Sequence, residues 1–197
     1  MKSITNNVFL RGKVSSEFQF SHNENKDCYY MSEIEIKRTS GYTDRIPVMV
    51  SNKTYILPKV GSHVCVKGHF HSYKQNITGR NRLMLKVLAL EIMYWNKKAE
   101  ETDENRIYLD GFICKQPVCR KTPMGRYIAD VCVAVNLSHN HSDYLPCIFW
   151  GKMQEMFHIF LSVVQYSYGD EFRAENILKK QKKNGKNELL MKYQYPK

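Results

Sequence analysis

The residues of this chain best able to bind a ligand are lysines and arginines gathered beside glycine-containing turns. The densest group surrounds Asn184-Gly185, a dipeptide typical of a two-residue β-hairpin turn. Its cations are Lys179, Lys180, Lys182, Lys183 and Lys186. Because lysine and arginine neutralise phosphates without reading sequence, this hairpin is predicted to contact a polyanion. A solvated charged face, or in a eukaryote a nuclear address, is the alternative for a lone lysine run.

A second basic hairpin occurs earlier in the chain, with its turn predicted between residues 76 and 81. Its candidate binding residues are Tyr73, Lys74, Arg80 and Arg82. It differs from the later hairpin in carrying an aromatic ring, which can stack on any base. The recurrence of a basic hairpin at corresponding positions favours a shared binding role over chance.

A third basic group surrounds the turn formed by residues 122–125, Thr-Pro-Met-Gly. These residues are predicted to clamp the backbone of a bound strand, with an ordinary solvated turn as the alternative. The group consists of Arg120, Lys121, Arg126 and Tyr127.

Two aromatic residues complete the candidate interface. Neighbouring residues on a strand point to opposite faces, so one of Phe149 and Trp150 is expected in the core and the other outside. We expect Trp150 to face outward, and an ordinary core tryptophan is the alternative. Tyr144 lies between Asp143 and Pro146, which are typical of a strand edge, and is also expected outside.

Residue types that support metal binding or catalysis are poorly grouped. His69 and His71, like His139 and His141, lie two residues apart, but no acid or cysteine stands at ligand spacing beside them. No nucleophile elbow, zinc-protease helix, Walker loop or dinucleotide fingerprint occurs. The sequence therefore predicts a protein that is not an enzyme and holds no metal and no cofactor.

The overall charge favours a polyanionic partner, since 30 basic side chains oppose 19 acidic ones for a formal net charge of +11. Residues 1–98 hold 16 basic and 7 acidic side chains, residues 99–104 hold 4 acidic and no basic ones, and residues 105–197 hold 14 and 8. No stretch approaches the roughly 18 apolar residues of a membrane span. Without a secretory signal, a cytoplasmic protein with free thiols at its six cysteines is expected.

The chain repeats itself at a fixed distance. Residues 8–12, Val-Phe-Leu-Arg-Gly, recur as residues 107–111, Ile-Tyr-Leu-Asp-Gly, and residues 46–48 recur as 145–147 at the same offset of 99. Residues 60–62 and 168–170 correspond at an offset of 108, so the second copy carries an insertion. Within each copy the hydrophobic period is mostly two, which indicates strands.

This pattern predicts an all-β fold of two tandem OB-fold five-stranded barrels. The second barrel is expected to have a helix at residues 152–164, in the connector between its strands three and four. The predicted domains are residues 1–98 and 105–197, with residues 99–104 as a solvated acidic linker.

An ordered set of short motifs runs through residues 105–151. With it the segment resembles bacterial single-stranded DNA-binding proteins. The whole layout resembles the two-OB-fold variants of Gram-positive bacteria and their mobile elements. The motifs are Asn105-Arg106-Ile107-Tyr108-Leu109-Asp110-Gly111, Pro117, Arg120-Lys121-Thr122-Pro123-Met124-Gly125, Ala129-Asp130, Ala134-Val135-Asn136 and Ser142-Asp143-Tyr144-Leu145-Pro146-Cys147-Ile148-Phe149-Trp150-Gly151.

The resemblance implies that bases stack on aromatic side chains spread over the barrel face. Tyr144 and Trp150 fall on two stacking positions, His139 occupies a third, and a fourth falls among lysines near Lys182. The first copy has no aromatic residue at the positions that match Tyr144 and Trp150, which are Arg45 and Ser51. The aromatics left to stack there are Tyr42, Phe70 and Tyr73.

The resemblance also implies sequence-independent binding and protection of single-stranded DNA in replication, recombination or repair. Four OB barrels per functional unit are usual in that family, so a homodimer is expected, with no membrane and no small-molecule partner. Two alternatives stay open. One is a replication or conjugation accessory that mainly contacts protein or RNA. The other is a nuclease, for which the one tight acidic group is Asp103, Glu104 and Asp110.

Overall fold

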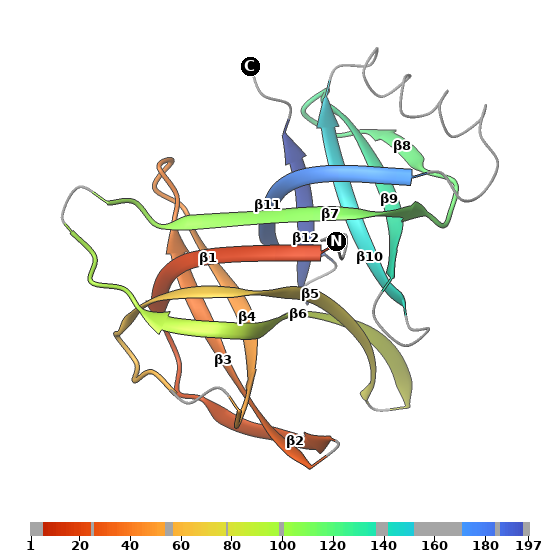
Figure 1. Cartoon of the computed structure of the whole chain (residues 1–197). Coiled ribbons are helices and arrows are strands. Elements are labelled where there is room, and N and C mark those ends of the chain that lie inside the picture. Colours follow the sequence, from red (N-terminus) through yellow and green to blue (C-terminus); the bar gives the residue numbers. More distant parts are fainter. Residues whose placement is uncertain are drawn as a thin grey trace.

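The fold consists of β-strands in every part of the chain that the structure, a computed structural model, describes (Figure 1). The described residues are 6–24, 26–53, 57–77, 79–98, 101–136, 142–151, 171–183 and 186–194, with the backbone only at residue 77 and from residue 150 onward. The predicted all-β class is confirmed for these residues, whereas the helix predicted at residues 152–164 lies outside them. The strands are β1 (Asn6–Val14), β2 (Gln19–Glu24), β3 (Asp27–Lys37), β4 (Thr43–Ser51), β5 (His63–Ile77), β6 (Arg80–Tyr94), β7 (Glu104–Ile113), β8 (Val118–Lys121), β9 (Tyr127–Asn136), β10 (Ser142–Gly151), β11 (Glu171–Lys183) and β12 (Lys186–Gln194).

The strand pairings close a ring in each half of the chain. In the first half β1 pairs with β3 and β5, β5 pairs with β6, β6 runs parallel to β4, and β4 pairs with β3. In the second half β7 pairs with β9 and β11, β11 pairs with β12, β12 runs parallel to β10, and β10 pairs with β9. The short strands β2 and β8 extend the rings beside β3 and β9.

The registers of the two rings follow the repeat found in the sequence. Ile34 pairs with Ile46 in the first half, and Val133 pairs with Leu145 in the second, each partner shifted by 99 positions. Val8 pairs with Gly68, while Ile107 pairs with Asn176, which reproduces the offset of 108 for the later strand. The internal repeat therefore extends from residue types to residue pairings.

The two rings join where β1 pairs with β7, near the middle of Figure 1. Val8 pairs there with Ile107, its own equivalent in the repeat. A strand that pairs with its own equivalent in an antiparallel register has a local two-fold axis at that pair. The halves are therefore arranged as a pseudo-symmetric dimer within one chain.

Side chains with period two fill the rings. Val8, Leu10 and Ile34 are fully buried in the first half, as are Ile107 and Leu109 in the second. One continuous cluster of buried residues spans both halves. Because each fully buried Val, Leu or Ile contributes about 1.5–3 kcal/mol, this shared core ties the two rings together.

The acidic segment between the halves is more tightly held than a solvated linker. Asp103 pairs with Lys97 at 2.6 Å and accepts the backbone N–H of Lys37 at 2.8 Å, and its side chain is only 4% exposed. The indole N–H of Trp95 donates to Glu101 at 3.0 Å. The side chain of Asp103 is therefore buried and not solvated as predicted, whereas Glu101 is half-buried and hydrogen-bonded. Residues 99 and 100 lie outside the described part.

The cysteines are free thiols with different surroundings. Cys147 is buried, which raises the pKa of its thiol, whereas Cys119 is exposed. Cys114 and Cys132 lie beside each other, and burial raises the pKa of Cys132 to about 12. None of the six is paired in a disulfide.

Candidate nucleic-acid interface

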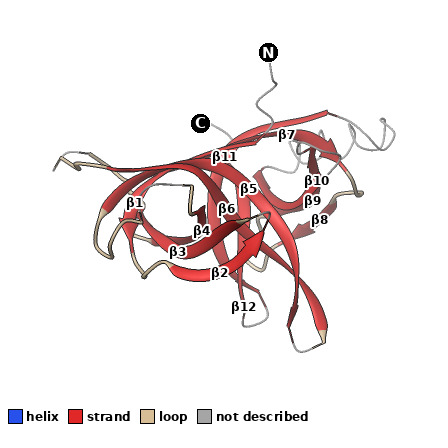
Figure 2. Cartoon of the chain, turned by 60° about the horizontal axis from the view of Figure 1, so that its bottom comes forward, coloured by secondary structure: helices blue, strands red, loops and turns tan. Residues whose placement is uncertain are grey.

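The predicted basic hairpin of the first half extends beyond its ring as β5 and β6 (Figures 1 and 2). The ladder continues to Ile77 and Arg80, and Gly79 closes the turn with a φ of +76°. Lys74 and Arg80 are exposed and Arg82 is half-buried. None of these three cations has an ion-pair partner among the described residues. They are therefore available to an anionic ligand.

The base of this hairpin carries two aromatic rings and a buried lysine. The rings of His71 and Tyr73 lie nearly parallel, at 11°, with centroids 6.4 Å apart. Lys86 places its ammonium 3.9 Å from the Tyr73 ring centroid and 2.9 Å from the sulfur of Met49. This geometry holds the Tyr73 ring in a fixed orientation through a cation–π contact.

Burial shifts the pKa values of Lys86 and Tyr73 at the base of the hairpin. Lys86 is only 4% exposed, and burial lowers its pKa to about 8, while the charges of Glu24 and Asp143 oppose that shift. Burial also raises the pKa of the Tyr73 hydroxyl. Sequence reasoning missed Lys86, which stands in the apolar run of β6 and pairs with His71 across the hairpin.

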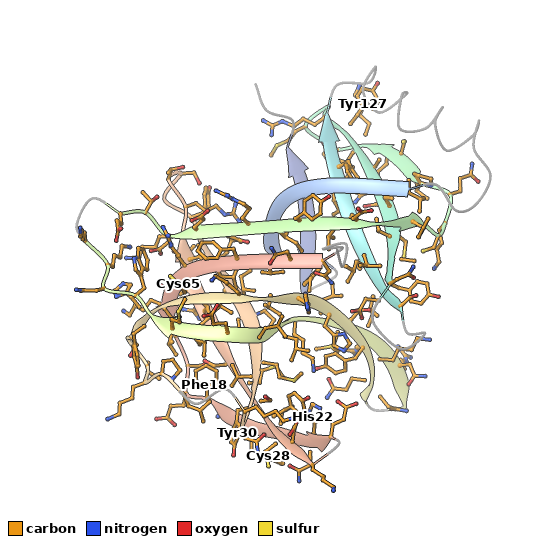
Figure 3. The ribbon with its side chains drawn as sticks, viewed as in Figure 1. Phe18, His22, Cys28, Tyr30, Cys65 and Tyr127 are labelled. Carbon is orange, nitrogen blue, oxygen red and sulfur yellow. The ribbon has the colours of Figure 1, made fainter. Side chains whose placement is uncertain are left out.

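A further aromatic group, also missed, lies on the β2–β3 hairpin, where Figure 3 labels His22 and Tyr30. The rings of His22 and Tyr29 stack at 5.0 Å and 11°. Phe20 contacts Tyr30 edge-on at 6.1 Å and is 59% exposed. The cross-strand partners of β2 bring these rings together, and no spacing within one segment indicates them.

The other two aromatic residues predicted to stack in the first half differ in exposure. Tyr42, in the turn between β3 and β4, is 73% exposed. Phe70 is fully buried in the core, so its predicted role as a stacking residue is wrong. Phe70 alternates on β5 with His69 and His71, and this alternation points it into the ring.

The basic turn of the second half is partly neutralised by its own neighbours. Arg120 donates to Asp130 at 2.8 Å, so its charge is already paired. Lys121 lies 5.6 Å from the ring of Tyr127, which packs partly against the core. Arg126 is exposed. Of this predicted clamp, Lys121 and Arg126 are the cations without an ion-pair partner among the described residues.

The aromatic residues of β10 follow the expected alternation as far as the structure describes them. Tyr144 is 53% exposed and Phe149 is 4% exposed. The outward direction of Tyr144 and the inward direction of Phe149 are confirmed. The side chain of Trp150 lies outside the described residues, so its outward direction stays a prediction.

The lysine hairpin is described through its backbone. β11 and β12 pair antiparallel up to Lys183 and Lys186, and the turn predicted at Asn184-Gly185 lies outside the described residues. The side chains of Lys179, Lys180, Lys182, Lys183 and Lys186 lie outside the described residues, as does His139.

The described part of the chain has neither a cluster of metal-binding side chains nor a membrane-spanning helix. Within it, no three His, Cys, Asp or Glu side chains lie close enough to hold a metal ion. His69 instead contacts the backbone carbonyl of Asn6, and His71 contacts Asp143. No described helix is long and apolar enough to cross a membrane.

Comparison with known proteins agrees with this geometry. Residues 104–163 match the single-strand binding protein family, whose members bind DNA and are not enzymes. The chain is thereby assigned as a non-enzymatic protein. No curated protein matches the sequence.

Two solved structures with the same fold are of a protein from Thermus aquaticus. The wild-type single-stranded DNA-binding protein of Thermus aquaticus is 16% identical, with a TM-score of 0.72 over 95% of this chain and 89% of its own. A deletion mutant of that protein gives 16% identity and a TM-score of 0.69 over 95% and 90%. The dimeric N-terminal domain of PriB from Thermoanaerobacter tencongensis is 29% identical, with a TM-score of 0.41 over 47% of this chain and 98% of its own. The chain thus has the fold of the Thermus aquaticus single-stranded DNA-binding protein, and its residues 104–163 match the single-strand binding protein family.

Proposed function

We propose that this protein binds and protects single-stranded DNA without sequence preference. The observation that carries the proposal is the β5–β6 hairpin, where Lys74, Arg80 and Arg82 have no ion-pair partner among the described residues and where the base presents Tyr73. Stacking on an aromatic ring contributes about 1–3 kcal/mol per base, and the cations neutralise phosphates. The family match of residues 104–163 supports the same ligand for the second half.

We interpret each closed ring as an OB-type barrel, which makes residues 1–98 and 105–197 two tandem domains. The order β1-β3-β4-β6-β5 and its repeat in the second half support this interpretation. OB barrels bind oligonucleotides across an outer strand face and the adjoining hairpins. The proposed setting is DNA replication, recombination or repair in the cytoplasm, as in the two-barrel variants that the sequence resembles.

Titration of oligothymidylate, duplex DNA and RNA by fluorescence anisotropy tests the function directly. We expect tight binding of the single strand, with a log–log salt slope of about −0.7 for each neutralised phosphate. Weak binding of duplex DNA is expected because its bases cannot stack on protein rings. Preference for RNA would favour the accessory-protein alternative, and salt-insensitive affinity would contradict phosphate neutralisation.

Substitution of Trp150 by alanine is expected to cost about 1–3 kcal/mol of DNA affinity, because a stacking ring is lost. Poly-dT should quench much of the tryptophan fluorescence of the unmodified chain. Trp95 is the expected internal reference, because its indole N–H is already bound to Glu101 and it lies outside the predicted stacking positions. If Trp150→Ala melts the protein while the affinity survives, Trp150 belongs to the core.

Association into a homodimer is expected from exposed apolar side chains on β6. Leu90 is 62% exposed, Tyr94 57% and Met93 40%, and large exposed apolar surface favours association. A dimer would contain four rings and raise avidity through a second set of hairpins. Light scattering at micromolar concentration should give twice the chain mass, and a mass near 23.2 kDa would contradict the dimer.

A further inference from the structure

Besides the β1–β7 pairing, the two halves touch where β5 of the first half meets β10 of the second, and the equivalent strands β4 and β11 touch as well. The carboxylate of Asp143, with a side chain only 1% exposed, accepts the backbone N–H of Ser72 at 2.8 Å and its hydroxyl at 3.0 Å. His71 places its Nδ1 3.0 Å from the same carboxylate. The Ser72 hydroxyl in turn accepts the backbone N–H of Tyr144 at 3.0 Å. We call these contacts the Ser72–Asp143 clasp.

The clasp joins the sequence neighbours of two aromatic residues that lie far apart in the chain. Tyr73 follows Ser72 on β5, and Tyr144 follows Asp143 on β10. The side-chain hydroxyl of Ser72, the residue before Tyr73, accepts the backbone N–H of Tyr144. Tyr144 is 53% exposed, and Tyr73 lies between the hairpin cations and this seam. One short single strand can therefore reach both rings.

The clasp differs from what the internal repeat places at the equivalent position. The equivalent of Asp143 is Asp44, which is also buried but pairs with Arg38 of its own half. A buried carboxylate is costly unless it is paired or hydrogen-bonded, and Asp143 obtains its donors from the other half. The described side chains of the clasp thus belong to the β5–β10 contact, whereas the side chains of β11 at the equivalent β4–β11 contact lie outside the described residues.

We infer that Tyr73 and Tyr144 form one composite site, in which a single-stranded nucleic acid passes from the first half to the second, and that the Ser72–Asp143 clasp positions the two rings. The inference rests on the proposed function and deepens it. Lys74, Arg80 and Arg82 provide the phosphate contacts on the hairpin side of the site. The anionic Asp143 does not repel the strand, because it is buried and accepts hydrogen bonds from Ser72.

A short oligonucleotide distinguishes a composite site from two separate ones. An oligothymidylate of about eight nucleotides falls within the 4–16 that one OB fold covers. In a composite site, Tyr73→Ala and Tyr144→Ala each weaken its binding roughly 5- to 150-fold, since each removes a stacking ring from the same complex. With two separate sites, the octamer keeps one intact site, so at least one of the two substitutions changes the affinity no more than about twofold. That second outcome would overturn the inference.

The clasp is tested by Ser72→Ala, which removes the hydroxyl bonded to both Asp143 and Tyr144. We expect weaker octamer binding by several fold with an unchanged salt slope, because no phosphate contact is lost. Tyr73→Phe keeps the ring and should keep the affinity. Asp44→Asn is the matched control, since it alters a buried aspartate at the equivalent position with Arg38 of the same half as its partner.

Two experimental outcomes distinguish a failure of the proposed DNA binding from a failure of the role of the clasp. If the unmodified chain binds no single strand of any length, the proposed function fails. If it binds long oligothymidylate tightly but Ser72→Ala leaves octamer binding unchanged while thermal unfolding shows a folded protein, only the positioning role of the clasp fails. An effect of Asp44→Asn as large as that of Ser72→Ala would also overturn that role.

Discussion

Replacing Lys179, Lys180, Lys182 and Lys183 with alanine is expected to weaken binding of single-stranded DNA by about 100- to 1,000-fold at 0.1 M salt. The four lysines lie on the part of β11 that pairs with β12 next to its turn. Each phosphate contact contributes about 0.7 to the log–log salt slope, so the slope should flatten by as much as about 2.8. Anisotropy titrations between 0.05 and about 0.5 M salt measure both quantities.

The matched control removes the same charge from surfaces outside the hairpins. Lys13, Lys37, Lys59 and Lys98 are exposed, so their alanine variant has the same net charge as the hairpin variant. We expect a much smaller loss of affinity and a slope close to that of the unmodified chain. Equal effects of both variants would mean that net charge alone attracts the DNA and that the β11–β12 hairpin does not touch phosphate.

The strands could be predicted from the sequence because burial follows their period of two. Ile34, Ile36 and Val133 are buried at alternating positions, which is the pattern that indicated strands. The lengths of β5 and β6 could not be predicted from that period. Both strands extend past the ring into solvent, where backbone pairing continues without a buried face to mark it.

The exposed parts of the candidate site could also be predicted, because cations beside a turn and an aromatic at a strand edge are local features. Tyr144 and Lys74 are examples, and both are exposed. The parts that were missed or misjudged depend on contacts between different strands and connections. Asp130 pairs with Arg120, and Asp103 is held by groups on β3 and after β6. No spacing within one segment shows such partners.

Lys86 is the clearest example of a site residue whose contacts cannot be predicted from the spacing of residues in one segment. A lysine in an apolar run usually points to solvent at its tip. Here Met49 of β4 and Tyr73 of β5 cover its ammonium, and neither partner is near it in sequence. The lowered pKa of Lys86 follows from this burial and is therefore a property of the fold.

Substitution of Gly111 by alanine is expected to destabilise the second ring by about 3 kcal/mol or more. A Cβ at Gly111 would lie 2.4 Å from the backbone oxygen of Ala134, at the point where β7 crosses β9 to close the ring. The repeat reproduces this close approach, because a Cβ at Gly12 would lie 2.4 Å from the backbone oxygen of Glu35. Backbone oxygens cannot move aside as a flexible side chain can, so one strand must shift. The pairing of Phe112 with Ala134 would then be disrupted.

Urea unfolding followed by tryptophan fluorescence measures this loss as a change in the free energy of unfolding. Since a domain of this size has about 5–15 kcal/mol in total, Gly111→Ala should lower the midpoint strongly, and Gly12→Ala should do the same in the first half. Lys13→Ala is the control at the same ring closure, because Lys13 follows Gly12, pairs with Glu35 and is exposed, so it should change stability by no more than about 0.5 kcal/mol. If both glycine variants unfold within about 0.5 kcal/mol of the unmodified chain, β1 and β7 do not cross β3 and β9 at this distance, and the two rings are open there.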